Sequence, residues 1–210
     1  LPIQIEPMVR KSGPPRLVLA SASPRRLNLL ARIGLTPDQV LPAEIDEAPM
    51  RGERPGPLAK RLSRVKGTAI AEQAPDAWIL SADTVVGVGR RILEKPANDG
   101  EASRFLSLLS GRRHQVYGGV TLISPAGKAV TRLTTTSVKF KRLEKDEIDA
   151  YIASGEWEGK AGGYAIQGCA GAFVRGINGS YFNVVGLPLY ETVSLLRGSG
   201  FVMPEPTDPE

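Results

Sequence analysis

Two residue types that often build metal centres and cross-links are nearly absent from this chain of 210 residues. It contains one cysteine, Cys169, and one histidine, His114. A single cysteine excludes a disulfide within the chain and a multi-cysteine metal site, and a single histidine excludes zinc chemistry built on a histidine cluster. No apolar run approaches membrane-spanning length, and residues 1–15 lack the apolar core of a signal peptide. We therefore expect a soluble protein of the reducing cytoplasm.

The residues that are present describe an ordinary globular protein with an excess of positive charge. Apolar residues make up 41% of the chain and charged residues 23%, which is typical of soluble proteins. The length allows one large domain or two small lobes with a real core. The formal net charge of +5 favours an anionic partner, either a nucleotide or a nucleic acid. A charge of this size does not distinguish between these two classes of partner.

Strand and helix patterns are mixed along the whole chain, which predicts an α/β fold with a mixed sheet. Residues 1–15 are expected to form a disordered leader and residues 201–210 a loose tail. The glycine-rich stretch 155–172 is expected to lack regular structure. The predicted strands cover residues 17–20, 37–45, 78–86, 113–124, 128–141 and 172–177, and the predicted helices cover residues 24–34, 58–73, 98–111 and 144–154, with a last helix from Pro188.

Apolar spacing indicates which faces of these helices pack inward. The helix after residue 97 is expected to begin with a capping box formed by Asn98 and Glu101. In the preceding helix, Lys66 falls on one of the polar faces. The predicted buried sets are Leu27, Leu30 and Ala31 in the first helix, Leu58, Leu62, Val65 and Ala69 in the second, and Ala102, Phe105, Leu106 and Leu109 in the third.

The most informative local pattern is a short buried strand that turns through two serines into the first helix. Ser23 is predicted at the helix N-cap, where its hydroxyl accepts a hydrogen bond from a free backbone N–H group. Arg25 and Arg26 then occupy the first helical turn, where the helix dipole disfavours cations. Backbone donors, the hydroxyls of Ser21 and Ser23 and two guanidinium groups thus converge, which indicates a phosphate site. The alternative is a pair of solvated arginines on a surface helix.

Two groups of carboxylates are candidates for chemistry. Asp83 lies in the middle of an otherwise apolar strand, where an unpaired carboxylate is costly. It is either a structural residue bonded to nearby backbone and to Thr84, or a general base or metal ligand in a cleft. Asp46 and Glu47 lie beside a proline- and glycine-rich connector. They form either a solvated loop or, together with Asp83, an oxygen site for Mg²⁺ or Mn²⁺.

Two lysines and one amide are further candidates. Lys66 and Lys95 are either solvated or bind phosphate, and Lys95 is the more notable because the proline after it fixes the backbone. Gln167 is flanked by glycines, which suits the close approach of a flat ligand, and its amide both donates and accepts, as a base edge requires. The alternative is a glycine-rich turn with a solvated glutamine. Cys169 is expected to be a small buried residue, and His114 to help end the preceding helix.

These motifs, in this order, resemble the Maf family of nucleoside triphosphate pyrophosphatases. The resemblance runs from about residue 16 to residue 197, and the ordered set is far more specific than any single motif. The chain departs from the family pattern at Gly118-Gly119, where Thr-Gly is frequent, and before Lys160, where an aspartate is frequent. The matching segments are Ser21-x-Ser23-Pro24-Arg25-Arg26, Asp46-Glu47, Lys66, Ser81-Ala-Asp83-Thr84-Val85-Val86, Glu94-Lys95-Pro96, Leu109-Ser-Gly-Arg112, His114-x-Val116, Lys160-Ala-Gly162, Tyr164-x-Ile166-Gln167-Gly168 and Asn183-Val-Val-Gly-Leu-Pro188.

The resemblance implies a fold, a reaction and a set of site residues. The fold would be an elongated mixed β-sheet flanked by helices, with residues 16–200 forming a single domain whose two lobes enclose a deep cleft, as in inosine triphosphate pyrophosphatases. Family members hydrolyse a nucleoside triphosphate to the monophosphate and pyrophosphate with a divalent metal cation. By matching motifs, the implied proton acceptor is Asp83, the metal ligands are Glu47 and Asp83, the triphosphate ligands are Ser21, Ser23, Arg25, Arg26, Lys66 and Lys95, and the base preference is set by Arg25, Thr84 and Gln167.

The resemblance favours a particular substrate. The combination of Arg25, Thr84 and Gln167 is similar to the branch that prefers dTTP and UTP, with modified pyrimidine nucleotides left open. Two alternatives remain: a pyrophosphatase for a purine nucleotide or 7-methyl-GTP, and a nucleotide- or nucleic-acid-binding inhibitor of septum formation without catalysis. The chain has neither an aromatic-rich single-strand motif nor a long basic arm. We therefore expect a nucleotide substrate, no membrane, no stable nucleic acid complex and a homodimer.

Overall fold

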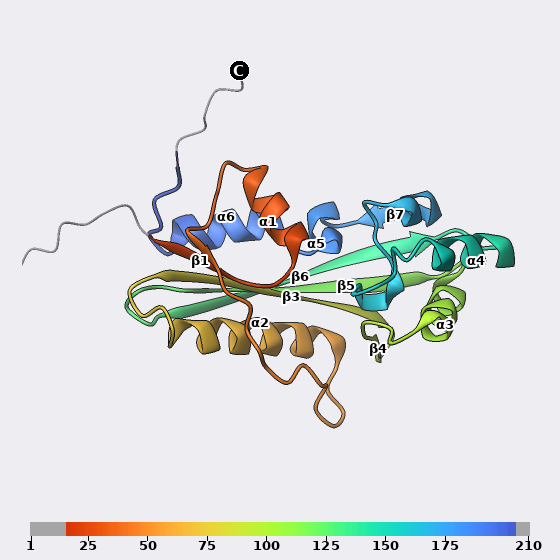
Figure 1. Cartoon of the computed structure of the whole chain (residues 1–210), viewed down its shortest axis with the longest axis horizontal. Coiled ribbons are helices and arrows are strands. Elements are labelled where there is room, and N and C mark those ends of the chain that lie inside the picture. The colour runs from red at the N-terminus through yellow and green to blue at the C-terminus, as the bar shows by residue number, and fades with distance from the viewer. Residues whose placement is uncertain (1–15, 205–210) are drawn as a thin grey trace, which may run out of the picture.

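The computed structural model describes residues 16–204, so the leader predicted at residues 1–15 lies outside the described residues. Figure 1 shows an elongated molecule in which three long strands run side by side through most of its length. They are β3 (Trp78–Val88), β5 (Arg113–Ile123) and β6 (Ala129–Phe140). These strands connect the two ends of the molecule, and the other elements pack onto them.

The long strands belong to one mixed sheet, which has seven strands within residues 16–204. Its order is β2-β1-β3-β5-β6-β7, and β4 also pairs with β3. Strand β1 is parallel to β2 and β3, and the remaining pairs are antiparallel. The shorter strands are β1 (Leu17–Ala20), β2 (Gln39–Val40), β4 (Arg91–Leu93) and β7 (Val174–Asn178). The predicted α/β fold with a mixed sheet is confirmed.

Helices cover both faces of this sheet, as predicted (Figure 1). Helix α2 lies along one face, α1 and α6 lie on the other, and α3 and α4 gather at the end that carries β4 and β7. Among the helices of residues 16–204, none combines the length and apolar character that a membrane crossing requires. The bounds are α1 (Pro24–Ala31), α2 (Pro55–Ala71), α3 (Asp99–Leu109), α4 (Lys145–Ala153), α5 (Tyr181–Val185) and α6 (Leu189–Gly198), with 3₁₀ helices η1 (Ala161–Gly163) and η2 (Cys169–Phe173).

Most predicted elements lie within a few residues of their observed limits, but four regions differ. The stretch 155–172, expected to lack regular structure, contains η1 and most of η2. The strand expected over residues 37–45 is reduced to β2, because only two residues pair with β1. Helix α2 begins at Pro55 rather than residue 58, since proline fits the first helical turn, where its missing N–H has no intrahelical role. The sequence pattern missed α5, a helix of only five residues.

The predicted buried faces are confirmed for α3 and wrong for parts of α1 and α2. In α1, Leu27 is 37% exposed, whereas the guanidinium-bearing Arg26 is buried. In α2, Val65 is 40% exposed and Lys66 is buried. Apolar periodicity cannot detect a buried cation, because it scores every charged residue as outward-facing. Of the residues predicted to be buried in α1 and α2, three are exposed and one is only partly buried: Leu27, Ala31 and Val65, and Ala69. Leu30, Leu58 and Leu62 are buried as predicted, and Leu29 and Ile70 are buried as well.

Glycines allow α2 to lie unusually close to the sheet. A Cβ atom on Gly119 of β5 would lie 2.1 Å from the backbone oxygen of Ala59 in α2. A Cβ atom on Gly67 of α2 would lie 2.6 Å from Oγ of Ser81 in β3. Both distances are far below ordinary carbon contacts, so larger residues at these positions would push the helix away. This close packing sets the position of α2 relative to β3.

The segment after α6 packs against the other end of the sheet. Phe201 is buried, and its ring makes an edge-to-face contact with Trp78 at a centroid distance of 5.9 Å. The tail was predicted to start at residue 201, and its last part, residues 205–210, lies outside the described residues.

Candidate active site

One cavity of about 370 Å³ brings together ten of the residues that the sequence singled out for the site, whereas Asp46, considered with Glu47 as a possible metal ligand, is exposed and does not line it. Its walls come from the strand–turn–helix of β1 and α1, the loop before α2, the middle of β3, the segment after β4 and the loop around η1. These elements are widely separated in sequence and meet only through the fold. The predicted residues that line the cavity are Ser21, Ser23, Arg25, Arg26, Glu47, Lys66, Asp83, Thr84, Lys95 and Gln167.

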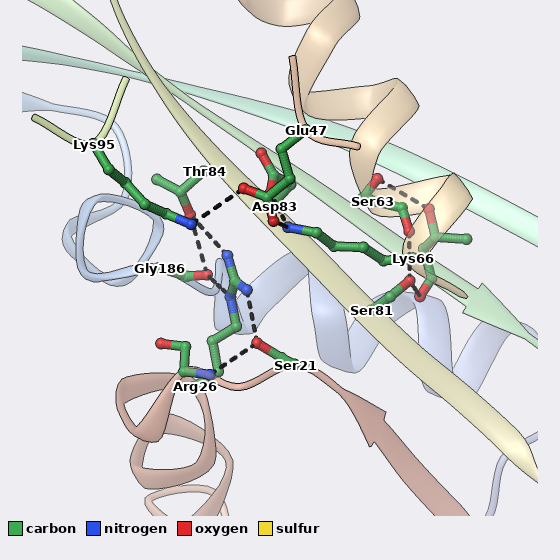
Figure 2. Close-up of polar contacts among 12 residues, drawn as sticks. Ser21, Arg26, Glu47, Ser63, Lys66, Ser81, Asp83, Thr84, Lys95 and Gly186 are labelled. Atoms are coloured by element: carbon green, nitrogen blue, oxygen red, sulfur yellow. Dashed lines mark hydrogen bonds and ion pairs between the residues drawn. The ribbon is translucent and has the colours of Figure 1, made fainter. Parts of the chain in front are cut away.

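The centre of the cavity is a chain of alternating charges. Nζ of Lys66 lies 2.6 Å from Oδ1 of Asp83 and 2.6 Å from Oε1 of Glu47. Nζ of Lys95 lies 3.1 Å from Oε2 of Glu47, so one carboxylate joins the two lysines. Figure 2 shows these groups converging from α2, β3 and the segment after β4. The arrangement places two carboxylates around a single cationic group.

This geometry bears on the interpretation of Asp83 as a residue bonded to nearby backbone and to Thr84. The carboxylate is buried and faces the cavity, and its hydrogen-bond partner is Lys66. Thr84 does not bond to it; the Thr84 hydroxyl instead lies within hydrogen-bond distance of Arg26 and of the Gly186 carbonyl. A buried carboxylate needs such a cationic partner, because an unpaired charge in the interior is strongly unfavourable. Asp83 is therefore a cavity residue rather than a backbone-bonded structural one.

Glu47 is the more accessible of the two carboxylates and is held in its charged form. Burial alone would raise the pKa of Glu47, but the hydrogen bonds and positive charges of Lys66 and Lys95 outweigh burial and hold it below its usual value. Glu47 is partly exposed, so it can exchange these partners for a ligand. It remains anionic well below neutral pH.

Arg26 is not a solvated arginine on a surface helix. Its Nε donates to the Gly186 carbonyl at 2.9 Å, Nη1 to Oγ of Ser21 at 2.8 Å, and Nη2 to Oγ1 of Thr84 at 3.3 Å. Figure 2 shows the guanidinium group between these three acceptors. Burial is the main influence on this group and lowers the pKa of Arg26. Arg26 therefore joins β1, β3 and the segment after α5 at the cavity wall.

The two neighbouring residues of the turn behave differently from Arg26. Ser23 occupies the N-cap position, as predicted, but its hydroxyl makes no capping hydrogen bond, which corrects that expectation. Its backbone N–H donates to Oγ of Ser21 at 3.2 Å. Arg25 is partly buried, and its Nε donates to the Val185 carbonyl at 3.3 Å. Burial lowers the pKa of Arg25.

The glycine-rich segment forms the wall that carries Gln167. Gln167 is exposed on this segment and lines the cavity, as predicted. The segment is anchored by Gly162, whose N–H donates to the Glu94 carbonyl at 3.0 Å, and by the hydroxyl of Tyr164, which lies 2.8 Å from Nε2 of His114. His114 is thus buried in the sheet, and the prediction that it ends a helix is wrong. Burial lowers the pKa of His114 to about 4.

The prediction for Cys169 is also wrong, because Cys169 is exposed rather than buried. Its backbone N–H donates to Oε2 of Glu156 at 2.8 Å. A hydrogen bond and the negative charge of Glu156 raise the pKa of the Cys169 thiol, so the thiol is less prone to form the nucleophilic thiolate. Cys169 does not line the cavity.

Sequence reasoning missed two charged residues of the cavity wall. Glu158 and Lys160 precede η1 and line the cavity. Lys160 belongs to a motif that matches the family, and the signal for a site role is its charge beside a glycine-rich segment. With these two, the lining contains five cationic side chains and three carboxylates. The excess of cations suits a polyphosphate, which distributes several negative charges over a few ångströms.

The donor set for a metal cation is small but suitable. Residues 16–204 contain no group of three or more histidine, cysteine, aspartate or glutamate side chains that could hold a metal ion. Glu47 and Asp83 do approach one point, since both contact the same Nζ of Lys66. Magnesium is commonly held by one or two carboxylates, with phosphates and water as the other ligands. The two carboxylates therefore fit a hard divalent cation that binds together with a phosphate.

Sequence comparison assigns the chain to a family. The profile of the family described as Maf-like protein matches residues 16–199. The chain belongs to this family. The Maf-like chain is 57% identical over 196 residues to a dTTP/UTP pyrophosphatase of Chelativorans sp. (strain BNC1), which covers 90% of this chain and 94% of the relative. It is 57% identical over 187 residues to a dTTP/UTP pyrophosphatase of Caulobacter vibrioides, covering 89% and 97%.

A more distant likeness exists among solved structures. A nucleoside-triphosphatase / dITP/XTP pyrophosphatase from Mycobacterium abscessus superimposes on the Maf-like chain with a TM-score of 0.42 and 17% identity. The match covers 61% of this chain and 74% of that structure.

Proposed function

We propose that this Maf-like protein hydrolyses dTTP and UTP to the nucleoside monophosphate and pyrophosphate. The observation that carries the proposal is the cavity in which the buried Asp83 faces the cationic residues of the first helical turn. Relatives that are 57% identical over almost the whole chain are named dTTP/UTP pyrophosphatases. A carboxylate in reach of a bound polyphosphate is the arrangement that metal-assisted hydrolysis requires.

In the proposed mechanism, Asp83 accepts a proton from the water molecule that attacks the α-phosphorus. Lys66 holds the Asp83 carboxylate in place through the 2.6 Å contact. Negative charge that develops on the phosphate oxygens is stabilised by cations already positioned in the cavity, which lowers the barrier without reorganisation. The proposed triphosphate ligands are Ser21, Ser23, Arg25, Arg26, Lys66 and Lys95.

We propose that Glu47 and Asp83 hold Mg²⁺ or Mn²⁺ together with the phosphates of the substrate. When bound, such a cation supplies charge stabilisation to the phosphoryl oxygens. Lys66 contacts both carboxylates and so keeps them close together, and Lys95 contacts Glu47.

Base preference is assigned to Arg25, Thr84 and Gln167, of which Gln167 is the residue that can read a base edge directly. Its amide is exposed in the cavity wall and offers both a donor and an acceptor. Thr84 has its hydroxyl engaged by Arg26 and the Gly186 carbonyl. We infer that Thr84 acts through the position of Arg26 more than through the base itself.

A nucleotide panel tests the substrate assignment. The values of kcat/KM for dTTP and UTP should exceed those for dGTP, GTP and 7-methyl-GTP. In Gln167→Glu, the ratio of kcat/KM for dTTP over dGTP should fall by about tenfold or more, because a carboxylate cannot donate to the base. Gln73→Glu, an exposed glutamine away from the cavity, is the matched control. A uniform fall for all bases in Gln167→Glu would contradict its role in base recognition.

Metal dependence is tested with the second carboxylate. Chelation with EDTA should abolish hydrolysis, and added Mg²⁺ or Mn²⁺ should restore it. Glu47→Gln should raise the metal concentration needed for half-maximal rate by at least about tenfold, since even outer-shell partners of a metal are worth that much. Glu44→Gln is the control, because Glu44 is exposed on the same loop but does not line the cavity. An unchanged metal requirement in Glu47→Gln would remove Glu47 from the proposed metal site.

The same panel tests the alternatives to this substrate class. Higher kcat/KM for a purine nucleotide or 7-methyl-GTP would replace dTTP and UTP as substrates, and binding without pyrophosphate release would favour a non-catalytic binding protein. The proposal includes a cytoplasmic, house-cleaning role with the nucleotide as partner and no stable nucleic acid complex. A homodimer stays a prediction, which light scattering of the purified protein would test.

A further inference from the structure

Lys160 is a cavity residue to which the family resemblance assigned no role. It directly precedes η1, is partly buried, and lines the cavity together with Glu158. Its Nζ donates to the backbone carbonyl of Glu158 at 2.7 Å. This bond is local, within three residues of chain, and leaves two N–H groups of the ammonium for another acceptor. The side chain is therefore held beside the cavity with unused donors.

The charge of Lys160 differs from the other lysine charges of the cavity in having no close carboxylate. Lys66 and Lys95 both contact Glu47. Within residues 16–204, no carboxylate oxygen lies within 4.0 Å of the cationic nitrogens of Lys160 or Arg25. The hydrogen bonds described for these two residues go to carbonyl oxygens, at Glu158 and Val185. Arg26 has no carboxylate within this distance either, but its guanidinium group bonds to three acceptors. Lys160 and Arg25 are therefore the two cations of the cavity whose described contact is a single bond to a carbonyl oxygen.

These two cations also act on each other. The pKa of Lys160 is lowered first by burial and second by the positive charge of Arg25. The carboxylates of Glu156 and Glu158, more than 4.0 Å away, act in the opposite direction and raise it. Two like charges that approach each other in a partly buried wall are unfavourable without an anion between or beside them. A phosphate would remove this repulsion and would accept hydrogen bonds from both side chains.

We propose that Lys160 is a further substrate-binding residue, whose ammonium group holds a phosphate of the nucleoside triphosphate together with Arg25. The inference rests on the proposed function and extends it to a residue of the segment before η1. Lys160 and Gln167 lie on the same anchored segment, so a phosphate bound to Lys160 also fixes the segment that reads the base. Phosphate binding and base recognition are then coupled through one piece of backbone.

Three substitutions separate the charge of Lys160 from its bond to the Glu158 carbonyl. Lys160→Met removes both, Lys160→Gln removes the charge and keeps a donor, and Lys160→Arg keeps both. Lys128→Gln, in the exposed turn between β5 and β6, is the control for the change in net charge. The measurements are KM and kcat for dTTP, Kd for a non-hydrolysable α,β-imido analogue of dTTP, Kd for tripolyphosphate, and Tm.

We expect Lys160→Met and Lys160→Gln to raise KM and both Kd values by about 10- to 100-fold, the size of a charge-assisted hydrogen bond. The value of kcat should change much less, and Lys160→Arg should restore most of the affinity. Wild-type affinity in Lys160→Gln with an unchanged Tm would overturn the inference, since the ammonium charge would then be dispensable. Wild-type protein that hydrolyses no triphosphate would instead refute the proposed function, while the two Kd series would still test Lys160.

Discussion

Replacing Asp83 by asparagine should lower kcat for dTTP by about 10²- to 10⁴-fold, the usual contribution of a general base. Asparagine has nearly the same shape but cannot accept the proton of the attacking water. Lys66 keeps an ion-pair partner in the variant, because Glu47 lies 2.6 Å from its Nζ. The variant should therefore still fold and bind nucleotide. Steady-state release of pyrophosphate and the Kd of the α,β-imido analogue measure the two effects separately.

The matched control for this variant is Asp46→Asn. Asp46 is an exposed acid next to Glu47, and it does not line the cavity. Its Oδ1 accepts a hydrogen bond from the Ala48 N–H at 2.9 Å, which an asparagine side-chain carbonyl reproduces. Turnover in Asp46→Asn should match that of the wild type. Equal turnover in wild type and Asp83→Asn would end the assignment of Asp83 as the proton acceptor.

A large loss of stability is expected when Gly119 gains a single methyl group. Gly119→Ala should lower the free energy of unfolding by about 3 kcal/mol, because its Cβ would meet the Ala59 backbone at 2.1 Å and α2 would have to move. For a chain of this size, that corresponds to a fall in Tm of roughly 6–12 °C. Gly119 pairs with Asp83 across β5 and β3, and α2 carries Lys66. Turnover should therefore fall together with stability.

The control is another strand glycine with open space around it. A Cβ atom on Gly176 of β7 would have no neighbour within 4 Å. Gly176→Ala should change the free energy of unfolding by no more than about 0.5 kcal/mol. Thermal unfolding of both variants gives the comparison. Equal Tm values for Gly119→Ala and the wild type would show that α2 does not depend on this close contact.

The sequence predicted which residues line the cavity better than it predicted which helix residues are buried. Asp83, Gln167 and the residues of the strand–turn–helix are each chemically unusual in their local sequence, and the fold brings them together. Each of these signals depends only on neighbouring residues in the chain, so it can be recognised from the sequence alone. The lobes, the metal and the individual roles of these residues remain predictions, since geometry alone does not assign them.

Three buried polar residues that the sequence pattern did not place inward share a physical cause, which is stabilisation by partners far along the chain. Lys66 is buried because carboxylates 19 and 17 residues away from it meet its ammonium group, and apolar spacing contains no trace of this. His114 is buried because the Tyr164 hydroxyl, 50 residues away, lies next to its ring. Arg26 is buried because it bonds to the Gly186 carbonyl, 160 residues away. Such pairs become visible only in three dimensions.

The three long strands have a consequence for how a nucleotide enters and leaves. Strand β3 passes beneath the cavity as one continuous strand, paired to β5 residue by residue from Ile79 to Gly87. Bending this strand would break several backbone hydrogen bonds at once, whereas the wall at residues 42–47 contains no helix or strand. Opening of the pocket is therefore expected at residues 42–47, and the rate of product release depends on that loop.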